Sequence, residues 1–174
     1  MTRFVLGRAL LLTLTLCMGV AAAEPRADLQ LSFSAARDPR RVSYMDSTSH
    51  FHVLLQNRSD HEKRIWEDWN SWGYFNLSFE VIDSSGKKWV VKKRDTGFTR
   101  NFPSFLAILP GQTHVFDVYF GDDREWEGFP LRRGAEQTVH IRALYDVSET
   151  AESKTNEVWA GHLKSESIQV TFVR

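Results

Sequence analysis

Apolar and polar side chains alternate along much of this chain. Apolar residues recur at every second position in segments 29–33, 51–55 and 75–81. A period of two is typical of β-strands that bury one face and leave the other in water. The sequence therefore predicts seven or eight strands, completed by the shorter runs 89–91, 115–120, 139–145 and 168–173 and by segment 158–163 as an extra strand.

Turn residues fall between these segments. Asp83-Ser84-Ser85-Gly86 predicts a hairpin whose Gly takes a positive φ, and Pro110-Gly111 predicts a type II turn. No amphipathic helix of ten residues separates the strands, and only residues 60–68 are compatible with a helix of one or two turns. These features predict an all-β fold, an antiparallel sandwich rather than a set of βαβ units.

The first 23 residues have the organisation of a secretory signal peptide. Arg3 and Arg8 begin it, an apolar run follows at 9–20, and Ala21 to Ala23 provide a small-residue cleavage site. The run is short for a membrane span. We expect cleavage before Glu24, a single domain at 24–174, a periplasmic or secreted location in a bacterium, and no stable membrane insertion after cleavage.

The only cysteine, Cys17, lies inside this leader. The domain at 24–174 is therefore expected to hold together by packing, without disulfides. An alternative is that Cys17 is the lipidated residue of a lipoprotein. Leu16 before it disfavours this alternative, because the residue preceding the lipidated cysteine is usually small.

The charge balance argues against two classes of partner. The whole chain has 22 Lys and Arg and 22 Asp and Glu; because the leader holds two Arg and no acidic residue, the remainder has a net charge of −2. A nucleic-acid-binding domain is expected to carry a basic patch, and an anionic membrane surface also attracts basic segments. Neither partner is predicted.

The order of motifs resembles that of immunoglobulin-like domains of exported bacterial proteins. A strand ends in Asn57-Arg58-Ser59, a hairpin carries Asp83-Ser84-Ser85-Gly86, and Pro110-Gly111 begins a further strand. The layout, from residue 51 to 173, is similar to that of BsuPI-type protease-inhibitor domains and of uncharacterised secreted domains. This resemblance implies an immunoglobulin-like sandwich and raises the possibility of protease inhibition.

Segment 65–75 holds three of the six tryptophans, Trp66, Trp69 and Trp72, followed by Tyr74. Exposed aromatic rings stack on sugars or fill pockets in a protein partner. The competing and favoured interpretation is that these rings cap the open end of the sandwich, since aromatic-rich runs more often belong to a core. Sugar binding would require at least two of the rings to be coplanar and exposed.

A long connection at 94–109 has no clear strand signal. Its phenylalanines, Phe98, Phe102 and Phe105, favour a cover over a sheet edge, whereas Arg100 and Asn101 are candidates for contact with a partner. The guanidinium of Arg100 could hold a carboxylate or a carbonyl group of that partner.

Two metal-binding hypotheses are weak. His50 and His52 would share one face of a strand, where a ligand from a neighbouring strand could complete a zinc site, but no third ligand is evident in the sequence. The acidic stretch 121–128 has oxygen ligands for calcium without the spacing of an EF-hand loop. Solvent-exposed positions explain both better, so no metal or cofactor is expected.

Motifs of catalysis are not found: the chain has no G-x-S-x-G elbow, no H-E-x-x-H and no phosphate-binding glycine loop. We therefore predict a non-catalytic binding domain that contacts a protein or glycan through Trp66, Trp69, Trp72, Tyr74, Arg100 and Asn101. The alternatives are an inhibitor of extracellular proteases and a carbohydrate-binding accessory module.

Overall fold

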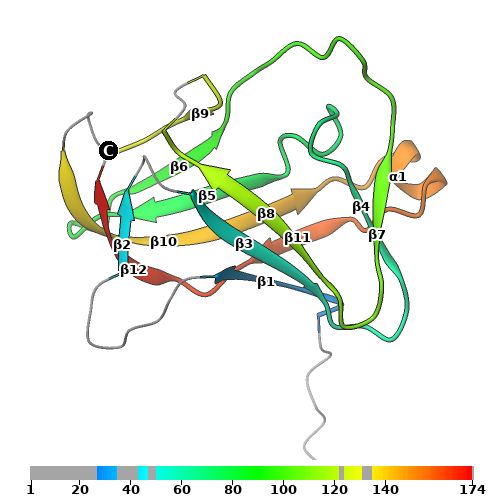
Figure 1. Ribbon diagram of the computed structural model, residues 1–174, viewed down its shortest axis with the longest axis horizontal. Helices are drawn as coiled ribbons and strands as arrows, with labels where there is room; N and C mark the ends of the chain where they lie inside the picture. Colours follow the sequence, from blue (N-terminus) through cyan, green and yellow to red (C-terminus); the bar gives the residue numbers. More distant parts are fainter. Residues whose placement is uncertain (1–26, 35–42, 47–49, 122–123, 131–134, 174) are drawn as a thin grey trace, which may run out of the picture.

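The computed structural model describes residues 27–34, 43–46, 50–121, 124–130 and 135–173. Within these ranges the protein is all-β and mostly antiparallel, as predicted, with one short helix (Figure 1). The elements are, in chain order, β1 (Leu29–Ser34), β2 (Ser43–Asp46), β3 (His50–Asn57), β4 (Lys63–Trp66), β5 (Leu77–Ile82), β6 (Lys88–Lys93), β7 (Phe105–Ile108), β8 (Thr113–Tyr119), β9 (Trp126–Glu127), β10 (Glu136–Val147), α1 (Ala151–Thr155), β11 (Gly161–Lys164) and β12 (Ile168–Val173).

The strands form two larger sheets and a two-stranded ribbon. The smaller of the two sheets has the order β1-β3-β8, and the larger has the order β2-β12-β10-β5-β6-β9, with β11 also paired to β10. Strands β4 and β7 pair with each other, and Arg64 of β4 also forms an isolated β-bridge with Val158. All of these pairings are antiparallel except the one between β2 and β12.

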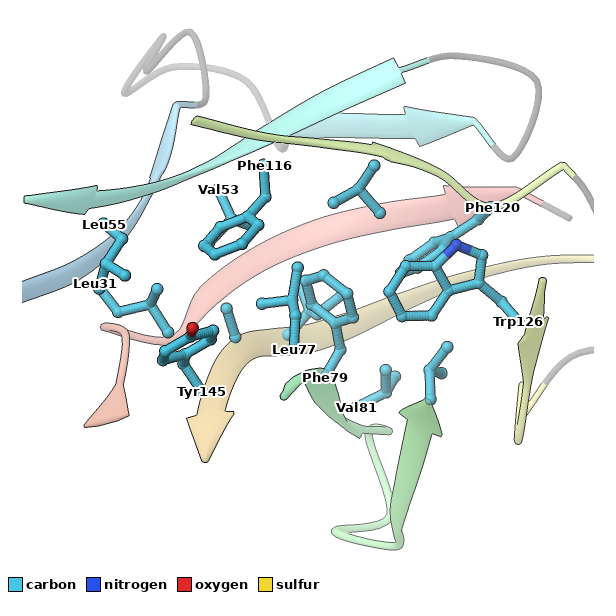
Figure 2. Close-up of a cluster of buried hydrophobic side chains, with 14 of the residues drawn as sticks. Leu31, Val53, Leu55, Leu77, Phe79, Val81, Phe116, Phe120, Trp126 and Tyr145 are labelled. Carbon is cyan, nitrogen blue, oxygen red and sulfur yellow. The ribbon is translucent and has the colours of Figure 1, made fainter. Parts of the chain in front are cut away.

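A core rich in aromatic side chains joins the two larger sheets. Phe79 of β5 is fully buried, and its ring lies 6.2 Å from that of Phe33 on β1 and 5.6 Å from that of Phe51 on β3. Farther along, the rings of Phe116 on β8 and Tyr145 on β10 are 5.5 Å apart. Figure 2 shows such side chains filling the space between the sheets. This two-layer arrangement is compatible with a β-sandwich.

Asn57 attaches the ribbon to the smaller sheet. Its side chain is fully buried at the end of β3, where Nδ2 donates to the carbonyl oxygens of Ile108 (2.7 Å) and His61 (2.8 Å). Its Oδ1 accepts hydrogen bonds from the backbone N–H (3.0 Å) and the hydroxyl (2.7 Å) of Ser59. A buried amide with all of these partners fixes where β4 begins and where β7 ends.

The predicted turns at Asp83 and Pro110 are present. Oδ1 of Asp83 accepts from the backbone N–H of Ser85 (2.8 Å), and Gly86 has a φ of 81° in the hairpin between β5 and β6. Gly111 has a φ of 76°, and the N–H of Gln112 donates to the carbonyl of Leu109 (3.0 Å). Both glycines occupy the left-handed region that other residues rarely adopt.

Three local features differ from the sequence prediction. The described residues contain twelve strands rather than seven or eight, because short strands such as β4, β7 and β9 lack enough residues to show alternation. No helix forms at 60–68, where β4 lies instead, with both Ile65 and Trp66 buried. The helix is α1, with Thr150 and Ser153 as a capping box.

The leader lies outside the described residues. Its cleavage site, Glu24 and Cys17 all fall within 1–26. Export and the domain boundary at residue 24 therefore stay predictions.

Candidate functional site

Two aromatic-rich loops lie side by side next to the β4–β7 ribbon. One is loop A, residues 66–74, which leaves β4; the other is loop B, residues 96–104, which leads into β7. The register of the ribbon places Trp66 opposite Phe105, so the two loops start from neighbouring positions. Both are seen above β4 and β7 in Figure 1. The sequence indicated the two segments as separate candidates, and the pairing of β4 with β7 brings them together.

Buried polar groups join the loops. Asn70 of loop A is fully buried; its Nδ2 donates to the backbone oxygen and the hydroxyl of Ser104 in loop B, both at 3.1 Å. The Oδ1 of the same amide accepts from the N–H groups of Trp72 and Gly73, both at 3.0 Å. Asn70 therefore shapes loop A and attaches it to loop B at once.

Glu67 provides a second connection between the loops. Its Oε2 accepts from the hydroxyl of Ser104 (2.7 Å) and from the indole N–H of Trp69 (2.6 Å). The N–H of Glu67 also donates to the backbone oxygen of Ser104 (3.1 Å). The indole of Trp69 is thereby held in one orientation.

Trp69 and Phe102 form an exposed aromatic pair across the two loops. Trp69 is 44% exposed and Phe102 is 54% exposed. Their ring centroids are 5.0 Å apart with the planes at 68°, an edge-to-face contact. Phe102 was expected to cover a sheet edge, and that expectation is wrong because its ring turns outward to meet Trp69.

A second aromatic cluster lies between loop B and the end of loop A. The ring of Tyr74 contacts those of Phe75 (4.9 Å) and Phe98 (5.6 Å), each edge-on. Phe75 is 43% exposed, whereas Tyr74 and Phe98 are half-buried. Tyr74 therefore supports this cluster more than it presents itself to solvent.

The other two tryptophans of loop A belong to the interior. Trp66 is only 3% exposed, and Trp72 is partly buried against the core. Their centroids are 6.1 Å apart with planes at 41°. Trp66 thus lies in the core and Trp72 packs against it, as the capping interpretation expects, and Trp66 has almost no exposed surface for a partner.

Arg100 and Asn101 have different surroundings. Arg100 is exposed, and no hydrogen bond or ion pair joins it to another described residue. Asn101 instead ties loop B to loop A: its Oδ1 accepts from the N–H of Ser71 (3.0 Å) and its Nδ2 donates to the hydroxyl of Ser71 (2.9 Å). Arg100 is therefore available to a partner, while the amide of Asn101 is occupied within the protein.

Lys93 supports the base of loop B. Its ammonium lies 4.4 Å from the ring centre of Trp126 and 5.1 Å from that of Tyr74, and it forms an ion pair with Glu125. The side chain is 16% exposed. A cation packed between two rings and a carboxylate fixes the point where loop B leaves β6.

His114 and Tyr145 are titratable groups on the core side of the sheets. Burial lowers the pKa of His114 and the carboxylate of Asp68 in loop A opposes this effect. Burial likewise raises the pKa of Tyr145 well above its usual value. Both groups are therefore expected to be uncharged at neutral pH, which suits a packed interior.

The described residues of the two metal hypotheses lie outside loops A and B, although Glu125 contacts Lys93 at the base of loop B. His50 and His52 on β3 both face Asp117 on β8, a neighbour that the sequence alone did not reveal. Of the acidic stretch 121–128, Asp122 and Asp123 lie outside the described residues, and Glu125 and Glu127 form ion pairs with lysines of β6. Calcium binding gains no support from these pairs.

Comparison with models of known protein families finds no match to this sequence, and no curated protein matches it significantly. In the part of the chain that the structure describes, no helix has the length and apolar character needed to cross a bilayer. The geometry of loops A and B is therefore the main evidence on function.

Proposed function

We propose that this protein is an exported, non-catalytic, immunoglobulin-like β-sandwich domain that binds a protein partner through loops A and B. The observation that carries the proposal is the pairing of Trp69 with Phe102. Two large apolar rings from different loops are exposed together, and buried hydrogen bonds of Asn70 hold the loops that present them.

The chemistry of this surface favours a protein over a glycan. Trp and Arg are among the residues that most often dominate protein–protein binding. Here the Trp69–Phe102 pair lies in the same loops as Arg100, which has no hydrogen bond or ion pair with another described residue. A sugar ring is best received by a flat aromatic platform. The planes of Trp69 and Phe102 meet at 68°, so the two rings do not form one.

The arrangement of the strands and turns supports the proposed immunoglobulin-like fold. Two sheets share one core, and the hairpin and turn expected from the resemblance to immunoglobulin-like domains join successive strands. Location in the periplasm or outside the cell rests on the predicted leader.

Site-specific photocrosslinking in the expressing bacterium tests the proposal. A photoreactive phenylalanine analogue replaces Phe102 in one protein and, as controls of similar exposure, Val90 or Val115 on the outer faces of the two larger sheets. We expect a discrete protein adduct from position 102, lost when Trp69→Ser is added, and no adduct from either control. Equal adducts at all three positions, or none at position 102, would contradict the proposal.

Two assays on the purified protein address the competing functions. Inhibition of a serine protease that is abolished by cutting loop B would favour the inhibitor function. Quenching of tryptophan emission by oligosaccharides, lost in Trp69→Phe, would favour the accessory module for carbohydrate. We expect neither effect.

A further inference from the structure

The outer face of the smaller sheet carries two histidines and an aspartate on adjacent strands. In the antiparallel register of β3 and β8, His52 lies directly opposite Asp117 and His50 opposite Tyr119. Neighbouring residues on the same strands, among them Val53 and Val118, are buried on the other face. The fold therefore gathers His50, His52 and Asp117 on one solvent-facing surface.

The donor atoms of these side chains approach a common oxygen. Nδ1 of His50 lies 3.0 Å from Oδ1 of Asp117, and Nδ1 of His52 lies 3.4 Å from the same oxygen. Ligands at the usual Zn²⁺ distances of about 2.0–2.1 Å in a tetrahedral arrangement are separated from each other by about 3.3 Å. Each of the two nitrogen–oxygen separations is thus close to one edge of a zinc coordination polyhedron.

The cluster is a hydrogen-bonded group and not a finished ligand set. Among the described residues, no three His, Cys, Asp or Glu side chains are already arranged to hold a metal ion. The side chains of His50, His52 and Asp117 are, however, 57%, 48% and 58% exposed. Rotation of an exposed side chain costs little free energy. A bound ion can therefore replace the contacts of the two imidazoles with Asp117 and bring both rings into its coordination sphere.

The ring of His50 already has a support. It stacks on Tyr119 with the centroids 4.9 Å apart and the planes at 19°. This stacking limits tilting of the imidazole and keeps the ring beside Asp117. Orientation of a histidine ligand by a neighbouring group is a regular feature of protein metal sites.

We propose that His50, His52 and Asp117 form a surface site for a divalent transition-metal ion of the Zn²⁺ type. Two imidazoles and one carboxylate are ligands that Zn²⁺ accepts, and three protein ligands leave a coordination position for water or another molecule. The site lies on β3 and β8, outside loops A and B, and is independent of the proposed protein-binding function.

The test is calorimetric titration of the full-length protein with ZnCl₂. We expect one ion per chain at this site, with affinity reduced at least about tenfold by His50→Ala, His52→Ala or Asp117→Asn, because loss of even an outer-sphere partner costs about 10- to 100-fold. The matched control is His162→Ala: His162 is also exposed and contacts one carboxylate, Asp146, at 2.6 Å, without a second histidine. This control should bind Zn²⁺ within about twofold of the wild type.

Three outcomes would overturn the site. These are wild-type binding weaker than about 100 μM, binding that His50→Ala and His52→Ala leave unchanged, and an equal loss in His162→Ala. Each variant differs from the wild type only at the named residue, so zinc bound elsewhere on the chain is common to all of them. Circular dichroism checks that each variant is folded, and His52→Gln, which keeps a polar side chain of similar size, replaces His52→Ala should that protein be unstable.

Discussion

At the scale of single residues, His114 links burial to the response of the protein to pH. Its ring lies edge-on to Phe116, with centroids 4.5 Å apart, on the core side of β8. Burial lowers the pKa of His114 in the folded protein, whereas an imidazole in the unfolded chain titrates near about 6.5. Below that pH the unfolded chain binds a proton at His114, whereas the folded protein does not. The free energy of unfolding therefore decreases as the pH falls toward the lowered pKa of His114 in the folded protein.

We therefore expect the free energy of unfolding, measured with urea, to decrease from pH 8 to pH 5 in the wild type. His114→Gln should decrease less over the same range. His140→Gln, which removes an exposed imidazole and leaves His114 in place, should follow the wild-type profile. Parallel profiles for His114→Gln and the wild type would show that His114 is not the group responsible.

The tryptophans of loop A show what one residue's identity can and cannot reveal. Their spacing and type correctly marked an unusual segment, but three chemically identical side chains divide into a core residue, a partly buried residue and an exposed residue. That division depends on the direction in which the chain leaves β4, which is set by Asn57 and by pairing with β7. Neither contact is local in sequence.

At the scale of elements, Asn70 is the buried residue that joins loops A and B, beside the contacts of Glu67 and Asn101. Asn70→Ala removes the side-chain bonds to Ser104 and to the N–H groups of Trp72 and Gly73. Because each such bond contributes about 0.5–1.5 kcal/mol and buried donors are left unpaired, we expect a loss of about 2–4 kcal/mol in urea denaturation. The photocrosslink from position 102 should also weaken.

Asn156→Ala is the control for this prediction. Asn156 is half-buried at the C-terminal end of α1, and among the described residues its side-chain amide donates to one group, the carbonyl of Glu152. Its removal should change the free energy of unfolding by less than about 0.5 kcal/mol. An equally small effect of Asn70→Ala would mean that other contacts hold the loops.

Strands with clear alternation could be predicted from the sequence, and short elements could not. Segments 29–33 and 51–55 became β1 and β3 because one face of each strand is buried and the other exposed. Strand β4 buries two adjacent residues, Ile65 and Trp66, so its pattern has no period of two. The position of Asp117 beside the two histidines likewise follows from the register of β3 and β8, which no local pattern encodes.

At the scale of the whole molecule, Phe79 joins the two larger sheets. Its ring contacts those of Phe33 and Phe51 on the smaller sheet and that of Trp126 on β9 of its own sheet. Phe79→Ala leaves a cavity at the centre of the interface, and such substitutions cost about 3–5 kcal/mol. We expect a fall of that size in the free energy of unfolding, measured by urea denaturation.

Val90→Ala is the matched control, since Val90 is 49% exposed on β6, the strand that pairs with β5. It should change the unfolding free energy by no more than about 0.5 kcal/mol. Similar losses in the two variants would show that the core does not depend on Phe79.

The hydrogen bonds between loops A and B also affect the conformational entropy that is lost when a partner binds. A segment that becomes ordered only on contact loses conformational entropy at that moment, and this loss weakens the complex. Asn70, Asn101 and Glu67 have already restricted the two loops before any encounter. Association at Trp69 and Phe102 should therefore resemble the docking of two rigid bodies, with little rearrangement of this protein's backbone.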